Sequence, residues 1–133
     1  MTPRFPFVKL PTALVLARVM TAVFFMAHAV VRVANGSIPQ FAGFLEKQGF
    51  PAALALVWTI TAVEIVAGVC LLLGRQVRPA AAALMVIAVG GILIIHRHLG
   101  WFVGEHGSGG SEYSVALIVL LVVVASADGQ RRG

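Results

Sequence analysis

The hydrophobic and polar positions of this 133-residue chain fall into long blocks. Four blocks are apolar enough for membrane-spanning helices, and they cover residues 11–33, 51–73, 77–95 and 112–127. At about 1.5 Å per residue the first three are roughly 28 to 35 Å long and the fourth about 24 Å, so all four can cross a bilayer, the last with some local thinning. The pattern predicts one domain over residues 1–133, an all-α integral membrane four-helix bundle.

A shorter amphipathic segment separates the first two spans, at residues 37–50. Its apolar residues recur at helical spacing, opposite its polar ones. The apolar set is Ile38, Phe41, Phe44 and Leu45, and the polar set is Gln40, Glu46, Lys47 and Gln48. This pattern is typical of a short helix that lies in the membrane interface.

Composition agrees with a membrane protein. Hydrophobic residues make up 59% of the chain and charged residues 11%, and the mean hydropathy is +0.96. The net charge of +5 does not indicate nucleic-acid binding, because the basic residues flank apolar spans and form no solvated, aromatic-rich patch. Arg18 and the length of the first span favour a retained helix over a cleaved signal peptide.

The distribution of Lys and Arg predicts the orientation. One face of the predicted bundle holds both termini and the short 74–79 connection, and it carries Arg4, Lys9, Arg75, Arg78, Arg131 and Arg132. The other face carries Arg32, Lys47 and Arg97. We therefore expect a multi-pass protein of the bacterial inner membrane with both termini in the cytoplasm.

Polar side chains form one stripe along the first span. Arg18, Thr21, Phe25, His28 and Arg32 lie within about 80° of one another on a helix. Glu64 is the acid well inside the second span, and a buried charge needs a partner. If the cytoplasmic ends of the two helices are level, Arg18 lies about 9 Å deep and Glu64 about 14 Å deep. We therefore predict a structural ion pair between Arg18 and Glu64.

A second group of polar residues converges at the outer mouth of the predicted bundle. Its members are His28, Arg32, His96, His98 and Glu112. We take this cluster as the candidate site for ligand binding or proton transfer. Each member also has a structural explanation: a hydrogen-bonded interior histidine, an arginine that reaches the head groups, or a carboxylate in the first turn of a helix.

No metal is assigned to this cluster, although His28, His96 and Glu112 are the candidate ligands. His96 and His98 point about 160° apart on a helix, so the sequence does not determine which of them faces the interior. The candidate pocket wall is formed by Phe25, Trp101 and Phe102. For Trp101 and Phe102, a membrane-interface aromatic belt is the favoured interpretation.

Several motifs occur in an order that resembles the DoxX family. They are LARVMTAVFFMAHAVVR in the first span, FAGFLEKQGFP in the loop, EIVAGVCLLLG in the second span, a histidine at the end of the third span, and GGSEY before the fourth. The resemblance covers about residues 16–124. It implies a small four-helix protein of the bacterial inner membrane, from a family named for a subunit associated with a terminal quinol oxidase and with thiosulfate oxidation that uses quinone as acceptor.

The resemblance also implies site residues. The family's first-span polar positions match Arg18, His28 and Arg32; its second-span acid matches Glu64; its third-span histidine matches His96 or His98; and its fourth-span acid matches Glu112. Relatives are linked to quinone or thiol oxidative stress, in some cases with a soluble partner.

Together these observations favour a redox-linked membrane protein that binds a quinone, or another small oxidisable compound, at the outer mouth. Quinone is the leading cofactor candidate, and haem or a metal ranks below it. The chain has no evident electron carrier of its own, so a bound redox group or a partner oxidoreductase subunit would be needed. Two alternatives stay open: a non-catalytic anchor or accessory subunit of an oxidoreductase complex, and a small transporter or sensor. A homo-oligomer is compatible with each of these three functions.

Overall fold

The computed structural model describes the backbone of residues 7–94 and 112–132, and the side chains of residues 7–94 and 113–129. The regular structure of these residues is entirely helical, in five helices. In chain order they are α1 (Leu10–Ala34), α2 (Ile38–Lys47), α3 (Ala53–Leu73), α4 (Val77–Ile94) and α5 (Glu112–Arg132). The all-helical prediction is confirmed for the described residues, and the first three spans begin and end within two residues of their predicted limits.

Turn residues with positive φ separate the helices. α1 has a proline in its first turn, which suits a helix start, and it is followed by Gly36 with φ +62°. α3 ends at Gly74, where φ is +71° and the N–H of Arg75 donates to the carbonyl of Cys70 across 3.0 Å. This is the hydrogen bond of a Schellman-type helix end, and it turns the chain directly into α4.

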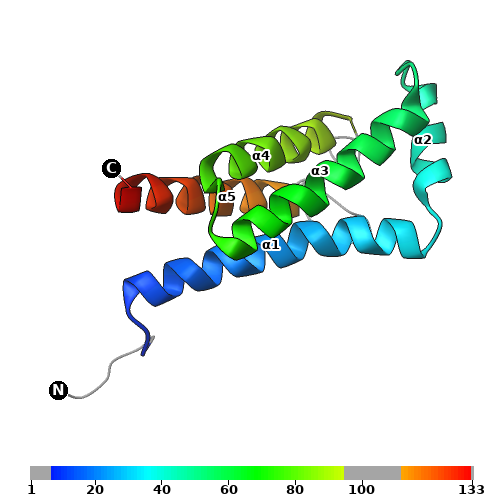
Figure 1. Cartoon of the computed structure of the whole chain (residues 1–133). Helices are drawn as coiled ribbons and strands as arrows, with labels where there is room; N and C mark the ends of the chain where they lie inside the picture. Colours follow the sequence, from blue (N-terminus) through cyan, green and yellow to red (C-terminus); the bar gives the residue numbers. More distant parts are fainter. Residues whose placement is uncertain (1–6, 95–111, 133) are drawn as a thin grey trace.

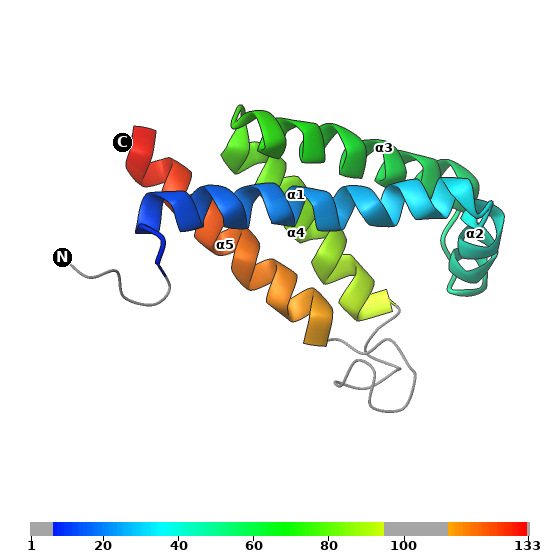
Figure 2. The ribbon, with the colours of Figure 1, turned by 90° about the horizontal axis from the view of Figure 1, so that it is seen from below.

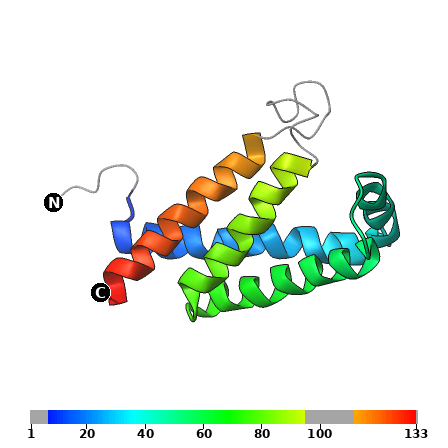
Figure 3. The same cartoon turned by 90° about the horizontal axis from the view of Figure 1, so that it is seen from above.

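The long helices are arranged as two crossing pairs (Figures 1–3). α1 packs beside α3, and α4 packs beside α5, while α3 also contacts α4 and α1 also contacts α5. The start of α1, the turn between α3 and α4, and the end of α5 lie at one end of the molecule, whereas α2 lies at the other (Figure 1). Because α4 and α5 run at an angle to α1, the pairs diverge toward the α2 end (Figure 3).

The main core occupies the region where the two pairs cross. Its larger buried side chains include Phe25, Leu71, Leu84 and Leu121, and many other positions are alanine. Close packing is tightest between α1 and α3, where Met26 lies directly against Gly68. A side chain at position 68 would have to displace Met26, so glycine there permits the close approach of the two helices.

A second, smaller core fixes α2 against the first half of α3. Ile38, Ala42 and Leu45 of α2 are buried against Ala53 and Val57 of α3. The amphipathic pattern predicted this helix, although Phe44, which the pattern placed on the apolar face, is 36% exposed. That α2 lies in the membrane interface stays a prediction.

The outer surface of the helices is strongly apolar. Large side chains such as Leu73, Val66 and Val86 are exposed, at 66%, 63% and 72% respectively. Soluble monomers rarely expose apolar surface continuously along several helices. α1, α3 and α4 are long and apolar enough to cross a membrane, and α5 contains a shorter apolar stretch, Tyr113–Gly129. The protein is therefore a membrane protein; a fourth span and a closed four-helix bundle stay predictions.

Candidate functional site

A buried ion pair joins α1 to α3. Arg32, in the last turn of α1, donates from Nη1 to Oε1 of Glu64 across 2.8 Å and to Oγ1 of Thr61 across 3.0 Å. The Thr61 hydroxyl in turn donates to the carbonyl of Val57 across 2.9 Å. Both hydrogens of Arg32 Nη1 therefore have acceptors, and only 3% of the Glu64 side chain is exposed.

This pairing corrects the predicted ion pair between Arg18 and Glu64, which was wrong. The guanidinium of Arg18 lies against Gly74, at the turn that follows α3, whereas Glu64 lies ten residues further up that helix. Ten residues correspond to about 15 Å, which is beyond the reach of an arginine side chain from that position. The prediction assumed that the start of α1 is level with the end of α3. In the structure it is the guanidinium of Arg18, further along α1, that lies level with the end of α3.

α2 contributes to the site through Phe41. The Arg32 guanidinium carbon lies 5.5 Å from the centre of the Phe41 ring, a distance typical of a cation–π contact. The short helix thus covers the ion pair and limits the exposed fraction of the Arg32 side chain to 17%. Sequence reasoning placed Phe41 on the apolar face of α2 but gave no reason to connect it with Arg32.

An aromatic group lies one turn before Arg32, toward α5. The ring of Tyr113 lies 5.7 Å from the ring of His28 and 6.4 Å from that of Phe24, measured between centroids. His28 itself is exposed, so it forms part of the rim of the site rather than its buried base. The contact connects the start of α5 to the same part of α1 that carries the ion pair.

These groups surround a cavity of about 400 Å³ between the diverging helix pairs. Apolar side chains form most of its lining, among them the buried Phe25 of α1, and α4 contributes Gly90 and Gly91. Its polar lining residues are His28, Arg32, Glu64, Tyr113 and Ser114. Oε1 of Glu64 is held by Arg32, whereas Oε2 accepts no hydrogen bond from any described residue. A mostly apolar cavity of this volume with a few polar groups is typical of a small-molecule site.

The structure brings together part of the predicted outer cluster. His28, Arg32 and the predicted wall residue Phe25 line the cavity. His96, His98, Trp101 and Phe102 lie outside the described residues, and Glu112 begins α5 with its side chain also outside them. Glu64, predicted for the inner half, lines this cavity instead.

Two lining residues were not predicted as members of the site. These residues are Tyr113 and Ser114, both in the first turn of α5. The adjacent acid Glu112 marked the right end of α5, but helical spacing alone does not show which residue of that turn faces α1. Within the described residues no group of three His, Cys, Asp or Glu side chains is arranged to hold a metal ion.

Comparisons with known proteins give one match. The DoxX family model matches residues 13–97, which is more than half of the chain and includes most of α1 and all of α2, α3 and α4. No curated protein and no solved structure matches. The matched region carries Arg32, Thr61 and Glu64, so the buried ion pair lies within the part of the chain that the family model covers. The chain is therefore a membrane protein of the DoxX family.

Proposed function

We propose that the cavity beside the Arg32–Glu64 pair binds a quinone, or a similar small compound with an oxidisable ring, in redox-linked membrane chemistry. The observation that carries this proposal is the combination of an apolar cavity of about 400 Å³ with charged and aromatic groups in its lining. A planar ring fits apolar walls that include Phe25. Its oxygen atoms need hydrogen-bond partners, and Tyr113 is one of the polar residues that line the cavity.

The ion pair gives the site groups for both oxidation states of such a ring. The arginine has further N–H groups beyond Nη1, which suit a quinone carbonyl oxygen. Oε2 of Glu64 suits a hydroxyl hydrogen of the reduced form, because it accepts no hydrogen bond from the described residues. Oxidation of a quinol releases two protons and two electrons. Glu64 and His28 line the cavity and are the groups that would take up protons; the electrons would pass to a partner oxidoreductase.

The test is equilibrium binding of short-chain benzoquinone and naphthoquinone, in oxidised and reduced forms, to the purified protein in neutral-lipid nanodiscs. Gly90→Leu should block the cavity, because a Cβ at position 90 meets no atom within 4 Å and therefore enters open space. Gly43→Leu is the matched control, since position 43 is equally open but does not line the cavity. We expect binding that is lost in the first variant and kept in the second.

Glu64→Gln separates charge from shape. Glutamine keeps an oxygen for Arg32 but has an NH2 donor in place of Oε2, which cannot accept a hydrogen bond from a quinol hydroxyl, so affinity for the reduced ring should fall more than affinity for the oxidised ring. If no quinone binds saturably, or if Gly90→Leu binds as wild type does, the quinone site should be abandoned. If quinone binding fails in this way but an oxidoreductase co-purifies with both wild type and Gly90→Leu, the protein is better explained as a non-catalytic anchor of that oxidoreductase.

A further inference from the structure

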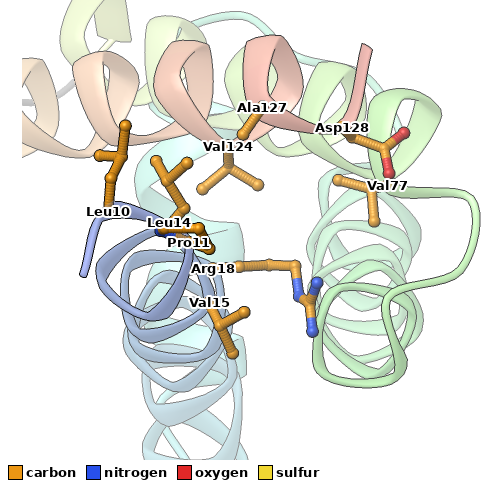
Figure 4. A pocket seen from close by; sticks show the side chains of 9 residues that line it. All are labelled: Leu10, Pro11, Leu14, Val15, Arg18, Val77, Val124, Ala127 and Asp128. Carbon is orange, nitrogen blue, oxygen red and sulfur yellow. The ribbon is translucent and has the colours of Figure 1, made fainter. Parts of the chain in front are cut away.

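A second cavity lies at the opposite end of the molecule and shares no residue with the first. Its volume is about 440 Å³, and it lies between the start of α1 and the end of α5. Apolar side chains form most of the lining: Leu10, Pro11, Leu14, Val15, Val77, Val124 and Ala127. Arg18 and Asp128 are its two charged residues (Figure 4).

The guanidinium of Arg18 contains a buried donor without a protein partner among the described residues. Its Nε is buried and makes no hydrogen bond with them. Buried polar groups almost always have a partner, and an arginine carries five donors. The arrangement therefore suits an acceptor other than the described residues, such as a bound ligand.

The level of this guanidinium matches the surface of a membrane. Arg18 lies eight residues, or about 12 Å, into α1, but its side chain reaches the turn between α3 and α4. A Cβ placed on Gly74 in this turn would lie 3.2 Å from Nη1 of Arg18. The turn also carries Arg75, and Arg78 follows in the first turn of α4; both are exposed. Exposed arginines beside apolar spans indicate the boundary with the head groups.

Asp128 does not neutralise Arg18. No ion pair between them is formed, and Val77 stands between the two charged groups in the view of Figure 4. Asp128 is 6% exposed and makes an interaction of its own. The partial negative charge at the C-terminal end of α3 favours the position of the guanidinium but leaves its buried Nε without an acceptor.

We propose that this cavity binds an anionic phospholipid. Its phosphate would accept hydrogen bonds from Arg18, and an acyl chain would lie along the apolar walls formed by α1 and α5. Inorganic phosphate offers the same oxygens, but it would leave the apolar walls unfilled. The combination of one partly buried arginine, whose Nε is buried, with a long apolar lining therefore fits a lipid and not a free ion. This inference does not depend on the proposed quinone site.

The experiment measures binding of short-chain phosphatidylglycerol to delipidated protein in neutral detergent, by native mass spectrometry and by the rise in Tm. Arg18→Gln should lower the affinity about tenfold, the loss expected when one charge-assisted hydrogen bond is removed. Arg75→Gln removes the same charge at the same end without lining the cavity, so it should bind as wild type does. Phosphatidylcholine and inorganic phosphate should give no comparable rise in Tm.

A third variant keeps the proposal testable if Arg18→Gln fails to fold. Ala127→Phe leaves Arg18 in place and fills the apolar part of the cavity, so it should also weaken phosphatidylglycerol binding. Equal phosphatidylglycerol binding by wild type and by either cavity variant would overturn the proposal. An equal rise in Tm with inorganic phosphate alone would show a free-anion site and would overturn the assignment to a lipid.

Discussion

Arg32 and Glu64 carry opposite charges in a part of the molecule that is apolar on most sides. Removing two charges from water costs several kcal/mol each, and their attraction offsets this cost only when the hydrogen bonds are good. Here the distance is 2.8 Å, Thr61 accepts the second hydrogen of Nη1, and Phe41 covers the guanidinium. The pair therefore fixes the register of α1 against α3 more than it adds net stability.

Replacing one member of the pair should be costly. Arg32→Met leaves the Glu64 carboxylate buried without its partner, and we expect a loss of about 3–5 kcal/mol, seen as a lower Tm of the purified protein in detergent. Arg32→Met combined with Glu64→Met should recover most of this loss. Lys47→Met, an exposed cation on α2, is the control and should change Tm little. An Arg32→Met protein as stable as wild type would refute the buried-pair argument.

A substitution at Gly68 tests the close contact between α1 and α3, because a single added Cβ would meet Met26. A Cβ at position 68 would lie 2.6 Å from Sδ of Met26, so Gly68→Ala should destabilise the protein by about 1–3 kcal/mol. Gly43→Ala meets no atom within 4 Å and should be neutral or stabilising, because alanine favours a helix. Adding Met26→Ala to Gly68→Ala should restore Tm if the clash is the cause; a double variant as unstable as the single one would show another cause.

At the residue scale the sequence predicted which side chains share a face but not which side chains meet. Thr21, Phe25 and Arg32 do lie on the inner side of α1, as helical spacing indicated. The partner of Glu64 depended on how far α1 is shifted along α3. Close packing at Gly68 contributes to that shift together with the ion pair itself, and a glycine that permits close packing leaves no pattern in the spacing of polar residues.

At the scale of elements, hydrophobic periodicity was sufficient to predict the helices. Pro11, Gly36 and Gly74 stand at ends of α1 and α3, and their backbone preferences explain why the predicted limits agree with the structure. The crossing of the two helix pairs was not predictable in the same way. The crossing depends on contacts between helices that are distant in sequence, such as α1 with α5. Because the two pairs cross at an angle, the cavity is left between them.

α2 should depend on its buried face for stability. Leu45 is 1% exposed in the smaller core, whereas its neighbour Phe44 is 36% exposed. Leu45→Ala should therefore cost about 2–5 kcal/mol, and Phe44→Ala should cost much less, as measured by Tm in detergent. Equal losses from the two variants would mean that α2 is not held by this face. Because α2 also covers Arg32 through Phe41, Leu45→Ala should weaken quinone binding as well if the proposed site is correct.

At the scale of the whole molecule, charge and topology agree on the orientation we propose. Lys9, Arg75 and Arg78 lie at the end that holds the start of α1 and the end of α5 (Figure 1). Arg32 is at the other end but is held in an ion pair, and α2 carries Glu46 beside Lys47. The excess of positive charge is thus at the end where the termini lie. In a bacterial inner membrane this end would face the cytoplasm.

Thiol labelling of intact cells tests this orientation and the number of spans together. In a Cys70→Ser background, Glu46→Cys should react with a membrane-impermeant maleimide from outside, because Glu46 is exposed on α2. Arg75→Cys and Gln130→Cys should react only after the membrane is permeabilised. Positions 75 and 130 share a side when α4 and α5 both cross or when neither does. Because α4 is long and apolar enough to span the membrane, protection of both positions would indicate that α5 crosses as well. Labelling of position 130 from outside, with position 75 protected, would show that α4 or α5 does not cross.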